Sequence, residues 1–65
     1  MKNNEKAIDA FIGTLVGIND HLDSIQKYME DHMGTSPDNI NWGHVGSARK
    51  VYEELDNIME FLGLN

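Results

Sequence analysis

Cysteine is absent from this chain of 65 residues, and proline occurs only once, as Pro37. The lack of cysteine excludes a disulfide framework and a thiolate zinc site, two common means of stabilising a very small domain. A chain of this length buries only about 60% of its unfolded surface and is marginally stable by itself. We therefore expect a single domain over residues 1–65 that relies on close helix packing, on oligomerisation or on both.

Basic residues and long apolar runs are also scarce. Five Lys and Arg stand against eleven Asp and Glu, for a net charge of −6, so general DNA binding is not expected. The polar start of the chain is unlike a signal peptide, and the longest apolar-leaning run is far shorter than the roughly 20 residues of a bilayer span. We expect a soluble, cytoplasmic protein without membrane contact. Its acidity serves solubility or fits a basic protein partner.

Apolar residues recur in steps of three and four along two segments, which is the heptad pattern of packed helices. The first seam consists of Ile8, Phe11, Leu15, Ile18, Leu22, Ile25 and Met29. The second seam consists of Val45, Ala48, Tyr52, Leu55, Met59 and Leu62. The two seams predict helices over about 4–33 and about 42–62.

Residues with known capping preferences stand near the ends of both segments. Asn3 or Asn4 can cap the first helix, and Gly34 supplies a left-handed residue for its end. Ser36 precedes the proline and can cap a single helical turn. Gly63 fits the position after the second helix, where a Schellman ending is expected.

Two helices joined by a short connection favour an all-α antiparallel helical hairpin. Both predicted apolar faces are wider than a contact between two helices requires. The additional apolar residues are Ile12 and Val16 beside the first seam, and Val51, Ile58 and Phe61 beside the second. Because a lone hairpin would expose much of this area, we expect copies to assemble into a homo-oligomeric helical bundle.

Two glycines stand four residues apart inside the first predicted helix, at Gly13 and Gly17. Each costs about 1 kcal/mol relative to alanine in a helix interior. Their spacing allows a flat ligand or another backbone to approach closely, and a tight helix crossing is the simpler interpretation.

Residues with catalytic or metal-binding chemistry form no recognisable arrangement. His21, His32 and His44 lie far apart, and none has a His or Cys three or four residues away. The serines have no recognisable base, and thiol nucleophiles are absent. We therefore expect no enzyme activity, no metal site and no cofactor.

The start of the second predicted helix is the one candidate binding site. The first N–H groups of a helix lack partners and lie at the positive end of its dipole, so they attract anions. Glycines there let a ligand reach the backbone, basic side chains neutralise phosphate, and an aromatic ring stacks on a base. The candidate ligand-binding residues are Trp42, His44, Gly46, Ser47, Arg49 and Lys50.

A second interpretation of the same basic residues involves no ligand. Arg49 and Lys50 stand four residues before Glu53 and Glu54, so each can form an exposed ion pair along the helix. Such pairs contribute only a few tenths of a kcal/mol. The sequence leaves both interpretations open.

The second predicted helix begins with a Trp, has a β-branched residue and a Gly three and four positions later, and continues as an amphipathic helix. The residues of this pattern are Trp42, Val45, Gly46, Ala48, Tyr52, Leu55, Ile58 and Phe61. In this pattern residues 42–62 resemble the C-terminal helix of small phage-encoded anti-CBASS proteins, which are oligomeric helical sponges for cyclic oligonucleotides. The first helix does not align with the ligand-contacting positions of that family, so no binding residue is transferred. The resemblance implies a small helical oligomer that binds a nucleotide-like signal between subunits.

Two functions follow as hypotheses, and a purely structural subunit of a helical bundle is a third possibility. The first is a non-enzymatic, oligomeric protein of a phage or mobile element that sequesters a cyclic nucleotide or other phosphorylated signal and so counters a host defence. The alternative is an acidic interaction module that inhibits or caps a basic partner protein through Glu53, Glu54, Asp56 and Glu60.

Overall fold

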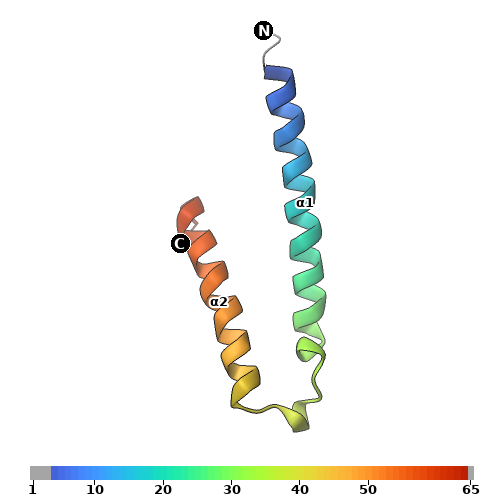
Figure 1. Cartoon of the computed structure of the whole chain (residues 1–65), viewed down its shortest axis with the longest axis vertical. Coiled ribbons are helices and arrows are strands. Elements are labelled where there is room, and N and C mark those ends of the chain that lie inside the picture. Colours follow the sequence, from blue (N-terminus) through green and yellow to red (C-terminus); the bar gives the residue numbers. More distant parts are fainter. Residues whose placement is uncertain (1–3, 65) are drawn as a thin grey trace. The chain divides into compact units, whose positions relative to one another are not determined.

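The computed structural model describes residues 4–64, which form two α-helices and two 3-10 turns and contain no strand (Figure 1). The elements in chain order are α1 (Asn4–Glu30), η1 (His32–Gly34), η2 (Pro37–Asn39) and α2 (Trp42–Leu62). The all-α class is thereby confirmed. The chain divides into two units between Gly34 and Thr35, and each unit contains one α-helix.

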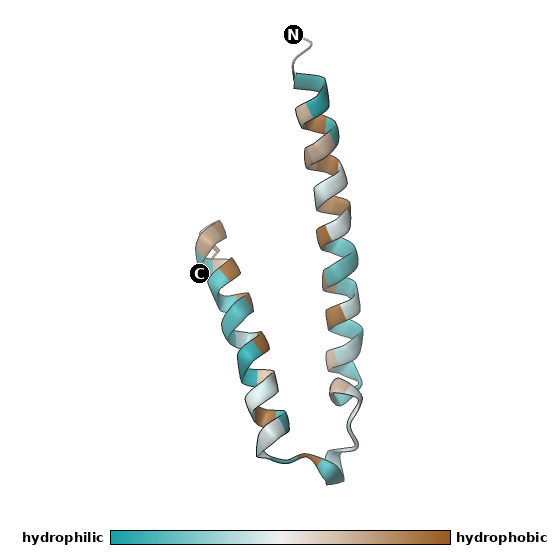
Figure 2. Ribbon diagram, viewed as in Figure 1, coloured by the Kyte–Doolittle hydropathy of each residue, from teal (hydrophilic) through white to brown (hydrophobic). Residues whose placement is uncertain are grey.

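The first unit is built on α1, which has 27 residues and is therefore about 40 Å long. Figure 2 shows apolar residues recurring along this helix, as the first seam requires. The seam is open to solvent, with 63% of Phe11, 42% of Leu15 and 47% of Leu22 exposed. Asn4 is the first helical residue, and the other expected cap, Asn3, lies outside the described residues.

The end of α1 differs from the expected boundary at residue 33. The helix ends at Glu30, and the N–H of Asp31 still donates to the carbonyls of Lys27 and Tyr28, both at 3.2 Å. His32 and Met33 then adopt φ angles of 56°, a left-handed conformation that residues other than glycine rarely adopt. The predicted last turn over residues 31–33 is therefore wrong.

The connection between the helices contains the predicted single turn, but its cap differs from the expected one. The turn is closed by the N–H of Asn39, which donates to the backbone carbonyl of Ser36 at 2.8 Å. The Ser36 side chain makes no capping hydrogen bond. Pro37 opens the turn because its fixed φ suits a first helical position.

The second unit is built on α2, whose observed bounds agree with the predicted range at both ends. Gly63 has φ 72° and its N–H donates to the Glu60 carbonyl at 3.1 Å. The N–H of Leu64 donates to the Met59 carbonyl at 2.9 Å, which completes the expected Schellman ending.

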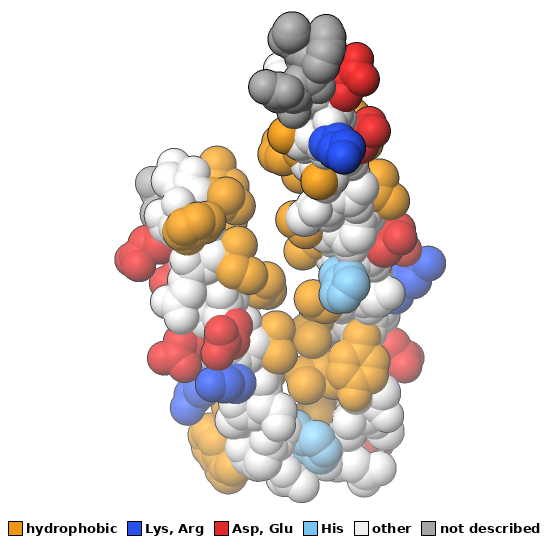
Figure 3. All heavy atoms as spheres, turned by 45° about the horizontal axis from the view of Figure 1, so that its top comes forward, with side chains coloured by type: hydrophobic (Ala, Val, Ile, Leu, Met, Phe, Trp, Pro, Cys, Tyr) orange, Lys and Arg blue, Asp and Glu red, His pale blue; other side chains and the backbone are white. Residues whose placement is uncertain are grey.

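None of the residues from 4 to 64 is buried. Figure 3 shows apolar side chains at the surface of each helix, together with acidic side chains. In α2 the three most exposed large hydrophobic side chains are aromatic: Phe61 at 86%, Trp42 at 79% and Tyr52 at 74%. Over the same range, neither helix has the length and apolar character to cross a membrane.

Candidate functional site

The N-terminus of α2 is closed by a capping box between Asn41 and His44. Asn41 Oδ1 accepts hydrogen bonds from the N–H groups of Gly43 at 2.8 Å and His44 at 3.2 Å. In return, the Asn41 N–H donates to His44 Nδ1 at 3.0 Å, so Nδ1 is the acceptor nitrogen of the imidazole in this arrangement. The His44 side chain, a predicted ligand contact, is thus engaged in capping the N-terminus of α2.

This cap also occupies the backbone donors that an anion would use. The N–H groups of Gly43 and His44 bond to the Asn41 side chain, and the Val45 N–H bonds to the Asn41 carbonyl at 3.1 Å. A Cβ atom at Gly43 would lie 3.0 Å from Asn41 Oδ1. Gly43 therefore makes room for the cap.

We expect replacement of Asn41 by alanine to lower the free energy of unfolding by about 1 kcal/mol, because two N–H groups lose their acceptor. The change is measured by urea denaturation followed by circular dichroism at a fixed protein concentration. Asn39→Ala is the matched control, because the Asn39 side chain makes no hydrogen bond within residues 4–64. Equal losses in the two variants would contradict the role of the cap.

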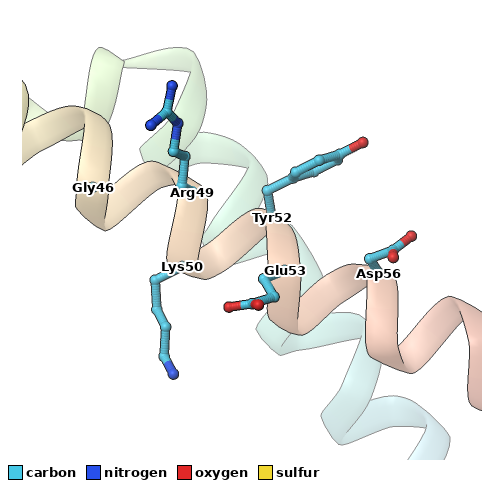
Figure 4. A pocket seen from close by; sticks show the side chains of 6 residues that line it. All are labelled: Gly46, Arg49, Lys50, Tyr52, Glu53 and Asp56. Atoms are coloured by element: carbon cyan, nitrogen blue, oxygen red, sulfur yellow. The ribbon is translucent and has the colours of Figure 1, made fainter.

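Farther along α2, six residues line an open surface depression (Figure 4). These residues are Gly46, Arg49, Lys50, Tyr52, Glu53 and Asp56. The structure thus brings three of the predicted ligand residues together, namely Gly46, Arg49 and Lys50. Trp42, His44 and Ser47 do not line the depression.

The two basic side chains of the depression differ in their partners. Lys50 Nζ lies 3.1 Å from Glu54 Oε2, so the interpretation as an exposed ion pair is confirmed for Lys50. Arg49 forms no ion pair or hydrogen bond with any residue from 4 to 64, although Glu53 stands four residues away. Figure 4 shows Arg49 and Lys50 pointing to opposite sides of the helix.

Sequence reasoning did not include Tyr52, Glu53 and Asp56 among the ligand-binding residues, although all three line the depression. The spacing contains a signal for them, because residues three, four and seven positions after Arg49 return to the same part of a helix surface. Two carboxylates beside Arg49 make the depression mixed in charge. Its lining carries two basic and two acidic side chains and therefore has no net charge.

The described part of the chain contains no cluster of three or more His, Asp or Glu residues that could hold a metal ion. Comparison with protein-family models, curated proteins and solved structures finds no match to this chain. The similarity to anti-CBASS sponges, the phage origin and the anti-defence role therefore stay predictions.

Proposed function

We propose that this chain is a non-enzymatic subunit of a homo-oligomeric helical bundle and that the two seams are buried between its helices. The observation that carries the proposal is that no residue from 4 to 64 is buried. Within the two seams only Ile25, Val45 and Leu55 are half-buried, and the other seam residues are exposed. Each unit by itself contains a single α-helix. Because helices in proteins derive most of their stability from packing an amphipathic face, each seam needs a partner.

The lengths of the seams favour a partner from another copy. The first seam spans about 32 Å from Ile8 to Met29, and the second spans about 26 Å from Val45 to Leu62. In the hairpin that the short connection favours, one α2 is therefore too short to cover the whole first seam. Ile12 and Val16, 54% and 55% exposed, widen the first apolar face further and leave area for helices of a second copy.

The charge distribution along α1 is compatible with self-association despite the net charge of −6. In heptad terms, the positions that flank the first seam carry no charged residue between residues 7 and 28. The flanking residues are Ala7, Ile12, Thr14, Asn19, His21, Gln26 and Tyr28. Acidic side chains of different copies are therefore kept away from the contact.

Sedimentation equilibrium or light scattering tests the proposal directly. The expected mass is at least twice the 7.4 kDa of one chain. A mass of one chain over the whole accessible concentration range would contradict the proposal.

A second candidate function is supported by one observation, the guanidinium of Arg49 that has no partner within residues 4–64. An arginine of this kind binds phosphate with two parallel hydrogen bonds. In this proposal the bundle sequesters a small phosphorylated signal at the depression.

For the second candidate, we expect Arg49→Ala to abolish binding of cyclic or linear nucleotides in calorimetric titration. Lys50→Ala is the matched control and is expected to retain binding, because Lys50 already pairs with Glu54 and points to the opposite side. Equal losses, or no binding by the unmodified chain, would exclude the site. The acidic-module alternative instead predicts salt-sensitive binding to a basic protein and no thermal shift with nucleotides.

A further inference from the structure

The second seam is self-complementary when two copies of α2 run in opposite directions. In an antiparallel pair of helices, each residue at the first apolar position of a heptad faces one at the fourth position of its partner. Placing Val45 opposite Leu62 also places Ala48 opposite Met59 and Tyr52 opposite Leu55. All six seam residues are then matched, and the smallest, Ala48, faces a long methionine. Shifting the register by one heptad leaves two of them unmatched.

The same register brings opposite charges together beside the seam. Arg49 and Asp56 each follow the fourth heptad position, so they occupy the same flank of α2 one heptad apart. In the antiparallel register, Arg49 of one copy and Asp56 of the other copy are offset by only about 3 Å along the helix axis. The two-fold axis repeats this pair, giving two ion pairs. The opposite flank carries Val51 and Ile58, which leave an apolar surface for a further helix of the bundle.

A parallel pairing does not produce these contacts. It would place Arg49 beside His44 and Asp56 beside Val51 of the other copy, so neither charge would find an opposite one. The flanks of the first seam also offer no carboxylate to Arg49 between residues 7 and 28. Glu5, in the first turn of α1, is the flanking carboxylate of that helix, so α2 of another copy is the partner that supplies one away from a helix end.

The geometry of α2 agrees with this pairing. Arg49 and Asp56 are both exposed, and neither forms an ion pair within residues 4–64. Figure 4 shows their side chains on the same side of α2 as Tyr52, a residue of the second seam. The charges are thus placed where the flank of an antiparallel helix would meet them.

We infer that two copies of this chain pair through antiparallel α2 helices, with Arg49 of each copy bound to Asp56 of the other. The inference rests on the proposed homo-oligomer and identifies one of its interfaces. It excludes the phosphate site of the second candidate function, because the same guanidinium is then bound to Asp56.

The first test exchanges the charges. Arg49→Asp and Asp56→Arg are each expected to weaken self-association at least about tenfold, because each variant sets like charges opposite one another twice. An equimolar mixture of the two variants restores both attractive pairs, so it is expected to form a mixed dimer preferentially. Lys50→Asp changes a charge on the other side of α2 and is the control that leaves association unchanged. Equal effects at positions 49 and 50, or no preference for the mixed dimer, overturn the inference.

The second test uses the absence of native cysteine. Chains with Val45→Cys and chains with Leu62→Cys are refolded together and oxidised, and the mixed disulfide is expected to exceed either homodisulfide. Ser47→Cys, away from the seam, is the control for random collision. A Val45→Cys homodisulfide as the main product indicates parallel helices and overturns the inference. An oligomeric mass without the mixed disulfide also overturns it but leaves the homo-oligomer intact, whereas a monomeric mass removes both.

Discussion

Replacement of Leu22 by aspartate is expected to dissociate the proposed homo-oligomer into single chains. Leu22 lies in the middle of the first seam and is 47% exposed in the chain by itself. The remaining exposed half of the leucine contributes about 1 kcal/mol when buried, and a carboxylate in the apolar contact costs at least about 1 kcal/mol more. The loss in a dimer is therefore about 4 kcal/mol, or about 1,000-fold in dissociation constant. Sedimentation equilibrium measures the mass, and circular dichroism measures the helix lost with it.

Ser24→Asp is the matched control for this variant. It adds the same negative charge in the same turn of α1, outside the first seam. We expect its mass and helix content to equal those of the unmodified chain. Dissociation of both variants would mean that charge, rather than the seam, controls assembly.

Replacement of both Gly13 and Gly17 by alanine is expected to raise the free energy of unfolding by about 2 kcal/mol without changing the mass. Each glycine costs about 1 kcal/mol in a helix interior. A Cβ atom built at either position has no atom of the chain within 4 Å beyond its local helix surroundings. Both positions also lie outside the first seam in the heptad. Urea denaturation at a fixed concentration measures the gain.

Gly34→Ala provides the opposite control. Gly34 has φ 72°, a conformation that alanine rarely adopts, so alanine there is expected to lower stability by about 1 kcal/mol. A loss of stability or mass in the double alanine variant would show that another backbone crosses α1 at Gly13 and Gly17. That result would support the tight crossing that the sequence suggests and contradict the present prediction.

The sequence predicts α2 better than α1 because their end signals differ in kind. Gly63 adopts a left-handed conformation at no steric cost, and the chain uses it as the pattern indicates. At the end of α1, the left-handed region begins two residues earlier, at His32 and Met33. Heptad periodicity carries no information on such a conformation, so the helix predicted from it continues to residue 33.

The candidate site was predictable only in part. The pairing of Lys50 with Glu54 follows from their spacing, but the same spacing between Arg49 and Glu53 produces no pair. The cap formed by His44 was missed because a capping box ordinarily has Glu or Gln at that position. Sequence spacing shows which residues can meet, whereas the rotamers of the folded chain decide which of them do.

The cap at Asn41 and the left-handed Gly63 have a kinetic consequence for the proposed bundle. Both ends of α2 are defined by hydrogen bonds within six residues of the chain, so these signals need no contact from elsewhere. Helices of this length form and melt within about a microsecond, far faster than two dilute chains meet. Two copies that meet therefore already have the second seam arranged along one side of a formed helix. For the proposed bundle, we therefore expect the rate of assembly to depend on protein concentration rather than on a search among helix boundaries.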